Sequence, residues 1–198
     1  MFMEDYMSKR VIVLLAEGFE EVEAITPIDY LRRAGIEVTT AAVGAKMTVT
    51  GAHRIPVTAD TSLDSLVKEG KLAAFEWDGV VVPGGLPGAE NLAASKETGA
   101  FLREMAGAGK LVAAICASPA MVLFPLGLLE GKKFTCSPGR EVNVTEAEWK
   151  QDRVVVDGNI ITSRGAGTAG DFACAVISKL AGEGEAKKVA EKVLHILA

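Results

Sequence analysis

Short, wholly apolar runs alternate along this chain with segments in which apolar residues recur at helical spacing. The runs at 11–15, 79–82 and 111–115 contain no polar side chain, which is typical of strands that a sheet buries on both faces. Between the first two runs, residues 20–33 repeat apolar positions every three or four residues and are closed by Gly35, which predicts a helix. The pattern therefore predicts buried strands separated by helices.

The rest of the chain continues this alternation. We expect a strand at 36–40, a hairpin at 47–58 around Gly51, a short helix at 62–70 and helices at 98–107, 168–180 and 185–197. Two strands at 153–156 and 159–162 are joined at Asp157-Gly158, a hairpin turn signal. Strands alternating with helices predict an α/β sandwich with a mostly parallel sheet. Ligands of such sheets bind at the carboxyl ends of the strands.

Length and charge narrow the class of protein. The 198 residues suit one domain, expected at 8–198, after a short acidic leader at 1–7 that lacks the features of a signal peptide. A net charge of −5 argues against non-specific nucleic-acid binding. The apolar stretch 111–129 is interrupted by Ser118 and Pro119, so we expect a strand, a turn and a short helix there rather than a membrane span.

Cysteine usage indicates a reducing compartment. The three cysteines form no CxxC pattern, which argues against a disulfide scaffold and against a zinc site. We therefore expect a cytoplasmic protein.

Cys116 is the first candidate for chemistry. It ends the apolar run 111–115 and is followed by Ala117, Ser118 and Pro119, with Ser118 a plausible helix N-cap. Small residues two positions before and after the thiol resemble a nucleophile elbow. Such a turn would place the sulfur at a helix N-terminus and lower its pKa. The alternative is a buried structural cysteine.

Two other strand ends carry candidate groups. Glu20 and Glu21 suit the start of a helix, and Glu23, on the same helical face as Glu20, could hydrogen-bond a thiol and carry its proton. Taken alone, a solvated charge is the better reading of Glu23. The glycine pair at 84–85 ends another buried strand, so its amides could face a reacting atom. The loop 162–168 lacks nucleotide-binding patterns, and we interpret it as structural or pocket-lining.

The remaining thiols and imidazoles have simpler interpretations. Cys174 falls in an apolar helical stripe and is expected in the core, whereas Cys136 ends a short strand and stays ambiguous. His53 lies in the expected hairpin and His195 in the last helix, so both are expected to be surface or packing residues.

Four segments together, at 15–23, 82–85, 113–117 and 162–168, resemble the ThiJ/PfpI superfamily in order and spacing. The closest resemblance is to its Parkinson-disease-protein, deglycase-type subgroup. It implies a flavodoxin-like three-layer sandwich, similar to class I glutamine amidotransferases, that forms a homodimer. It further implies that Cys116 is an oxidation-sensitive nucleophile, that Glu23 hydrogen-bonds it, and that the backbone N–H groups of Gly85 and Ala117 form an oxyanion site.

The resemblance also implies activity without a cofactor or metal. The activities of the subgroup are conversion of methylglyoxal-like α-oxoaldehydes to hydroxy acids, deglycation of their adducts, and redox-linked protein protection. The alternative to an enzyme is a redox sensor or oxidative-stress chaperone that uses oxidation of Cys116 without turnover.

Two departures from the family pattern matter. Ala117 stands where the protease-like branch has His, which argues against peptidase activity. Cys136 lies twenty residues after Cys116, about where relatives often carry His. We therefore consider Cys136 as a second thiol that captures oxidised Cys116 as a disulfide, the alternative being a partly buried strand-end thiol.

Overall fold

The computed structural model describes residues 8–196, so the expected leader at 1–7 and the last two residues of the expected domain lie outside it. The helices are α1 (Glu21–Arg33), α2 (Leu63–Lys68), α3 (Gly88–Ala94), α4 (Lys96–Gly107), α5 (Ala169–Ala181) and α6 (Glu183–Lys192). The strands are β1 (Arg10–Leu15), β2 (Glu37–Ala42), β3 (Thr48–Thr50), β4 (Pro56–Thr58), β5 (Thr61–Ser62), β6 (Gly79–Val82), β7 (Leu111–Ile115), β8 (Lys133–Phe134), β9 (Glu148–Trp149), β10 (Val154–Asp157) and β11 (Ile160–Ser163). No helix among these is long and apolar enough to cross a bilayer.

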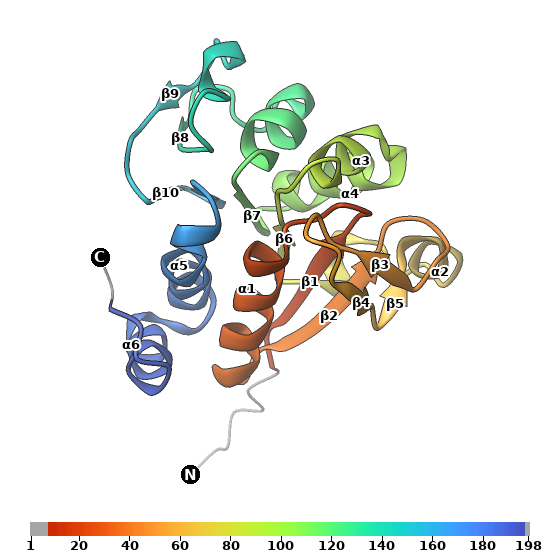
Figure 1. Cartoon of the computed structure of the whole chain (residues 1–198), viewed down its shortest axis with the longest axis horizontal. Coiled ribbons are helices and arrows are strands. Elements are labelled where there is room, and N and C mark those ends of the chain that lie inside the picture. The colour runs from red at the N-terminus through yellow and green to blue at the C-terminus, as the bar shows by residue number, and fades with distance from the viewer. Residues whose placement is uncertain (1–7, 197–198) are drawn as a thin grey trace.

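Seven strands form the central sheet, in the order β10-β11-β7-β6-β1-β2-β5 (Figure 1). All neighbouring pairs are parallel except β10 and β11, which form the hairpin expected at Asp157-Gly158. Strand order reverses direction between β1 and β6, because the chain first adds β2 and β5 on one side and later β6, β7 and β11 on the other. The carboxyl ends of β1, β6 and β7 therefore meet at this switch point, where ligands of open α/β sheets bind.

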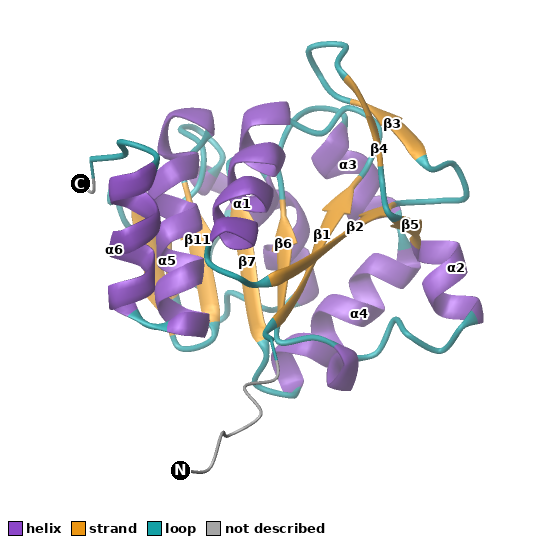
Figure 2. Cartoon of the chain, turned by 90° about the horizontal axis from the view of Figure 1, so that it is seen from below, coloured by secondary structure: helices purple, strands orange, loops and turns teal. Residues whose placement is uncertain are grey.

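Both faces of the sheet are covered, which confirms the predicted three-layer α/β fold (Figures 1 and 2). Side chains of β1 alternate between two apolar clusters: Val11 and Val13 pack with α1, α5 and α6, whereas Ile12 and Leu14 pack with α2, α3 and α4. A strand buried on both faces must be apolar at every position, which explains the continuous runs in the sequence.

The helices differ from the prediction in three places. A separate helix, α3, precedes α4 and was not predicted, because its start at Gly88 follows Pro87 and a glycine-rich turn. The last helix ends at Lys192 rather than continuing to 197, and Leu194 beyond it has φ of 57°. After Cys116 the chain makes one wide turn, Pro119–Leu123, and one tight turn instead of a regular helix, since Pro125 lacks the N–H that a continuing helix needs.

Candidate active site

Cys116 sits on a sharp turn directly after β7. Its φ of 63° lies in the left-handed region that side chains rarely adopt. The turn is held from both sides, since Cys116 N–H donates to the Ser163 carbonyl (3.0 Å) and its own carbonyl accepts from Ser137 N–H (2.8 Å). The N-cap role predicted for Ser118 is wrong, because its hydroxyl donates instead to the Pro83 carbonyl at 2.6 Å. The predicted elbow is therefore present, fastened to β6 and β11.

Glu23 points from the first turn of α1 toward this elbow and is 1% exposed. Helix α1 begins here because the Glu20 carboxylate accepts a hydrogen bond from Glu23 N–H (2.7 Å). The Glu23 carboxyl accepts from Gly84 N–H (2.9 Å) and also hydrogen-bonds Cys116 and the Ala166 amide. Its burial excludes the solvated-charge interpretation.

Gly84 makes the close approach of these two side chains possible. A Cβ at this position would lie 2.7 Å from both Cys116 Cβ and Glu23 Oε2. Gly84, the first glycine of the pair predicted at the end of β6, therefore leaves room for the thiol and the carboxyl.

The pKa of Glu23 is raised from 4.5 to about 7. Burial is the main cause, because a desolvated carboxylate is unfavourable, and the negative charge of Glu20 adds to it. The hydrogen bonds from Cys116, Gly84 and Ala166 favour the ionised form and limit the rise.

The pKa of Cys116 is raised to about 11, so the lowered pKa expected from a helix N-terminus is wrong. Burial is the largest cause, followed by the charge and the hydrogen bond of Glu23. Since the Glu23 charge disappears when that carboxyl is protonated, the two groups titrate as a pair.

Two hydrogen-bond donors oppose this rise. The Gly85 N–H and the Ser137 hydroxyl both hydrogen-bond the Cys116 sulfur and favour the thiolate. Gly85 has φ of 92° and passes so close to Glu20 N that a Cβ would lie 2.4 Å away, which explains the glycine there. Ala117 is buried next to the thiol, and the donor role of its N–H stays a prediction.

Ser137 is the site residue that sequence reasoning missed. It directly follows Cys136, which the sequence singled out because it lies twenty residues after Cys116. This spacing therefore pointed to the residue next to Ser137. Cys136 itself is fully buried, with its Sγ 3.5 Å from the Ser137 carbonyl. Burial raises its pKa to about 12, and the charge of Cys116 contributes, so the two thiols lie near each other. Cys174 is buried on α5 and is a core residue, as predicted.

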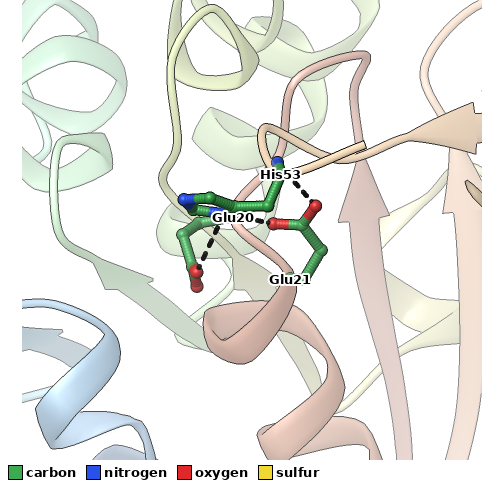
Figure 3. Close-up of side chains that lie close together, drawn as sticks. All are labelled: Glu20, Glu21 and His53. Atoms are coloured by element: carbon green, nitrogen blue, oxygen red, sulfur yellow. Dashed lines mark hydrogen bonds and ion pairs between the residues drawn. The ribbon is translucent and has the colours of Figure 1, made fainter. Parts of the chain in front are cut away.

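Glu20, Glu21 and His53 form the only group of three possible metal ligands that the described part of the chain brings together (Figure 3). Hydrogen bonds within the protein account for this cluster. Glu21 accepts from the His53 main-chain N–H (2.7 Å) and contacts the imidazole Nδ1 (2.8 Å), which raises the pKa of His53. The cluster therefore fastens the turn between β3 and β4 to α1. His195, the other imidazole, contacts Asp171 at 3.0 Å.

Comparison with known proteins places this geometry in a family. Residues 9–179 match the model of the DJ-1/PfpI family. Protein DJ-1 homolog B of Arabidopsis thaliana is 40% identical over 93% of this chain, and the chain spans only 41% of that protein's length. Deglycase PH1704 of Pyrococcus horikoshii is 36% identical over 78% of this chain and 89% of its own length.

Among solved structures, an oxidised DJ-1 from Toxoplasma gondii superposes with a TM-score of 0.89 at 37% identity, covering 95% of this chain and 99% of its own. Fold, motif order and sequence similarity agree along nearly the whole domain. The chain belongs to the DJ-1/PfpI family.

Proposed function

We propose that this protein is a cysteine-dependent, cofactor-free enzyme that converts methylglyoxal-like α-oxoaldehydes, or reverses their adducts. The observation that carries the proposal is the pairing of Cys116 on its strained elbow with the buried carboxyl of Glu23. The name of the Pyrococcus horikoshii relative, a deglycase, supports the same class of reaction.

The chemistry follows from the two groups. The Cys116 sulfur adds to the aldehyde carbon, forming a C–S bond, and the aldehyde oxygen takes up a proton to give a hemithioacetal. Glu23 removes the hydrogen of that carbon as a proton and returns it to the neighbouring carbon, while the proton of the new hydroxyl passes to the ketone oxygen. This leaves a thioester of the 2-hydroxy acid. Water then cleaves the C–S bond, releasing the hydroxy acid and the thiol. Methylglyoxal plus water therefore becomes lactate, with no external electron donor.

The pKa of Glu23 suits this role. A carboxyl that titrates at about 7 exists in both protonation states near neutral pH, as a group that accepts and then returns a proton must. The Gly85 N–H, which hydrogen-bonds the Cys116 sulfur, would also stabilise negative charge that develops on the substrate oxygen.

The test is lactate production from methylglyoxal in the absence of glutathione. We expect turnover by the wild type, none by Cys116→Ala, and a loss of at least about 100-fold in Glu23→Gln. Cys174→Ala is the matched control, because it removes a buried thiol in α5 away from the elbow. Equal rates in the wild type and Cys116→Ala would refute the proposal.

A second candidate function is redox sensing or stress protection through Cys116. One observation in its favour is that Cys116 is partly exposed, whereas Cys136 and Cys174 are buried. A second is that the similar structure from Toxoplasma gondii is of an oxidised protein. Peroxide transfers one oxygen to the thiolate to give a sulfenate and water, and a second peroxide gives a sulfinate. A protonated Glu23 would donate a hydrogen bond to that sulfinate.

Intact-mass measurement after mild peroxide treatment separates the two functions. A gain of two oxygens confined to Cys116, in a protein that makes no lactate, would favour sensing. Lactate production that peroxide treatment abolishes would favour the enzyme.

A further inference from the structure

Two arginines belong to the segments that hold the elbow of the candidate nucleophile. Arg164 directly follows Ser163, whose carbonyl accepts the Cys116 N–H. Arg140 closes the turn that begins at Ser137, since its N–H donates to the Ser137 carbonyl (3.2 Å). Its guanidinium also lies 3.2 Å from the sulfur of Met121, in the turn after the elbow. Both side chains are half-buried.

Neither guanidinium has an acidic partner among residues 8–196. Arg164 donates to the main-chain carbonyl of Gln151 (3.0 Å) and Arg140 contacts only the Met121 sulfur through its side chain. Four of the other six arginines have an acidic partner, as with Arg153 and Asp171 at 2.6 Å. The whole protein carries a net charge of −5. Two guanidinium groups without an acidic partner therefore have the opposite sign to that net charge.

One carboxyl lies beside the two arginines. Glu141 follows Arg140, and its Oε2 is buried without a hydrogen-bond partner in the described structure. Its charge opposes ionisation of the nearby Cys136 thiol more strongly than either arginine favours it. The Glu23 carboxyl at Cys116 is uncharged when protonated, and its pKa is about 7.

Space for a ligand group lies next to Arg164. A cavity of about 300 Å³ is bounded by Pro138, Arg153, Arg164 and the loop 165–168. Pro138 follows Ser137, which hydrogen-bonds Cys116, and Ala166 hydrogen-bonds Glu23. The cavity is therefore linked to the proposed catalytic pair through Ala166 and through the neighbour of Pro138.

We propose that Arg140 and Arg164 form an anion-binding rim, and that the site takes α-oxoaldehydes carrying a carboxylate a few bonds from the aldehyde. A guanidinium holds a carboxylate through two parallel hydrogen bonds, which suits such a group better than the methyl of methylglyoxal. With the carboxylate in the cavity beside Arg164, the aldehyde of the same small molecule can reach Cys116. The proposed substrate class rests on the proposed enzyme function. The proposed anion-binding rim does not depend on that function.

Alkylation of Cys116 tests the rim without turnover. The Cys116 thiolate reacts with both iodoacetate and iodoacetamide, which differ in charge. The ratio of the two rate constants is therefore independent of the fraction of Cys116 that is ionised. We expect this ratio to exceed that of N-acetylcysteine by about three- to tenfold at low salt and to fall as ionic strength rises. In Arg140→Gln/Arg164→Gln the ratio should return to the N-acetylcysteine value.

Two further variants separate charge at the rim from a general effect. Arg103→Gln removes the same charge from an exposed position on α4 and should leave the ratio unchanged. Arg164→Lys keeps the charge and should retain most of the ratio even where the turn is altered. A wild-type ratio equal to that of N-acetylcysteine, or an equal effect of Arg103→Gln, would overturn the rim.

Turnover then tests the substrate class. We expect 4,5-dioxopentanoate, an α-oxoaldehyde with a carboxylate, to show a kcat/KM at least about tenfold above that of methylglyoxal. Arg164→Gln should remove this advantage, so that the ratio of the two kcat/KM values falls to about one. Equal kcat/KM for both compounds in the wild type would refute the substrate class, whereas no turnover of either would refute the proposed function and leave the alkylation result standing.

Discussion

The main-chain N–H of Gly84 donates a 2.9 Å hydrogen bond to Oε2 of Glu23. This bond joins the end of β6 to the first turn of α1, and it holds the carboxyl against the elbow that carries Cys116. The absence of a side chain at position 84 is therefore as much a part of the site as the two reactive groups.

Gly84→Ala should abolish most activity. The added Cβ would lie 2.7 Å from Cys116 Cβ and from Glu23 Oε2, so one of the two must move, at a cost of about 1–3 kcal/mol in stability. Thermal unfolding and lactate production measure the two effects. Gly107→Ala, where a Cβ meets nothing within 4 Å, is the control and should keep full activity; a fully active Gly84→Ala would contradict this view of the site.

The alkylation rate of Cys116 should depend on pH in two steps. The first proton leaves the Glu23–Cys116 pair at about 7 and the second at about 11. The rate with iodoacetamide should rise to a plateau above pH 7 and rise again at higher pH, because thiolate is a constant fraction of the singly ionised pair. Glu23→Gln leaves one titrating group and should show a single step. A single step in the wild type would show that the pair is not coupled.

Stability should also depend on Glu23. Its pKa is higher in the folded protein, about 7, than the ordinary 4.5, so its favourable contribution is complete below pH 4.5 and is lost as pH rises to 7. The wild type should lose up to roughly 3 kcal/mol relative to Glu23→Gln over that range. Urea unfolding of both proteins at pH 5 and pH 8 gives the difference, and a constant difference would contradict the assigned pKa.

Cys136 should limit over-oxidation of Cys116. The hydrogen bond from Ser137 N–H to the Cys116 carbonyl keeps the two cysteine Cα atoms within about 7.6 Å by standard bond lengths, close to the limit of about 7 Å for a disulfide. A Cys116 sulfenate attacked by the Cys136 thiol gives a disulfide and water. Peptide mapping after limited peroxide treatment should show this linkage in the wild type, and Cys136→Ser should yield more Cys116 sulfinate. Equal sulfinate in both proteins would leave Cys136 as a buried core thiol only.

The protein should be a homodimer. Val22 and Ile25 on α1 are 47% and 41% exposed, and Ile55 is 55% exposed. The Ile55 N–H donates to the Glu21 carboxylate at 3.4 Å, which ties this residue to the start of α1. Light scattering should give twice the 20.7 kDa of one chain, and Ile25→Lys should shift the mass toward one chain. Val156→Lys, at an exposed position of β10, is the control; a single-chain mass for the wild type would contradict the expectation.

Sequence alone determined the layers of the fold. Runs such as 11–15 are typical of strands covered on both faces, and their alternation with helical segments predicts a parallel sheet. The elbow at Cys116 was also predictable, because an apolar run ending at a thiol with small neighbours indicates such a turn. These inferences depend on local patterns, which the chain carries without reference to distant residues.

Only the tertiary structure decided how the site works. The burial of Glu23 depends on β6 and on the loop before α5, so sequence position could not separate it from the neighbouring Glu20. The raised pKa of Cys116 follows from its own burial and from the adjacent Glu23 carboxyl. Ser137 reaches the Cys116 sulfur from a segment more than twenty residues away, and such proximity is set by packing, which no local spacing records.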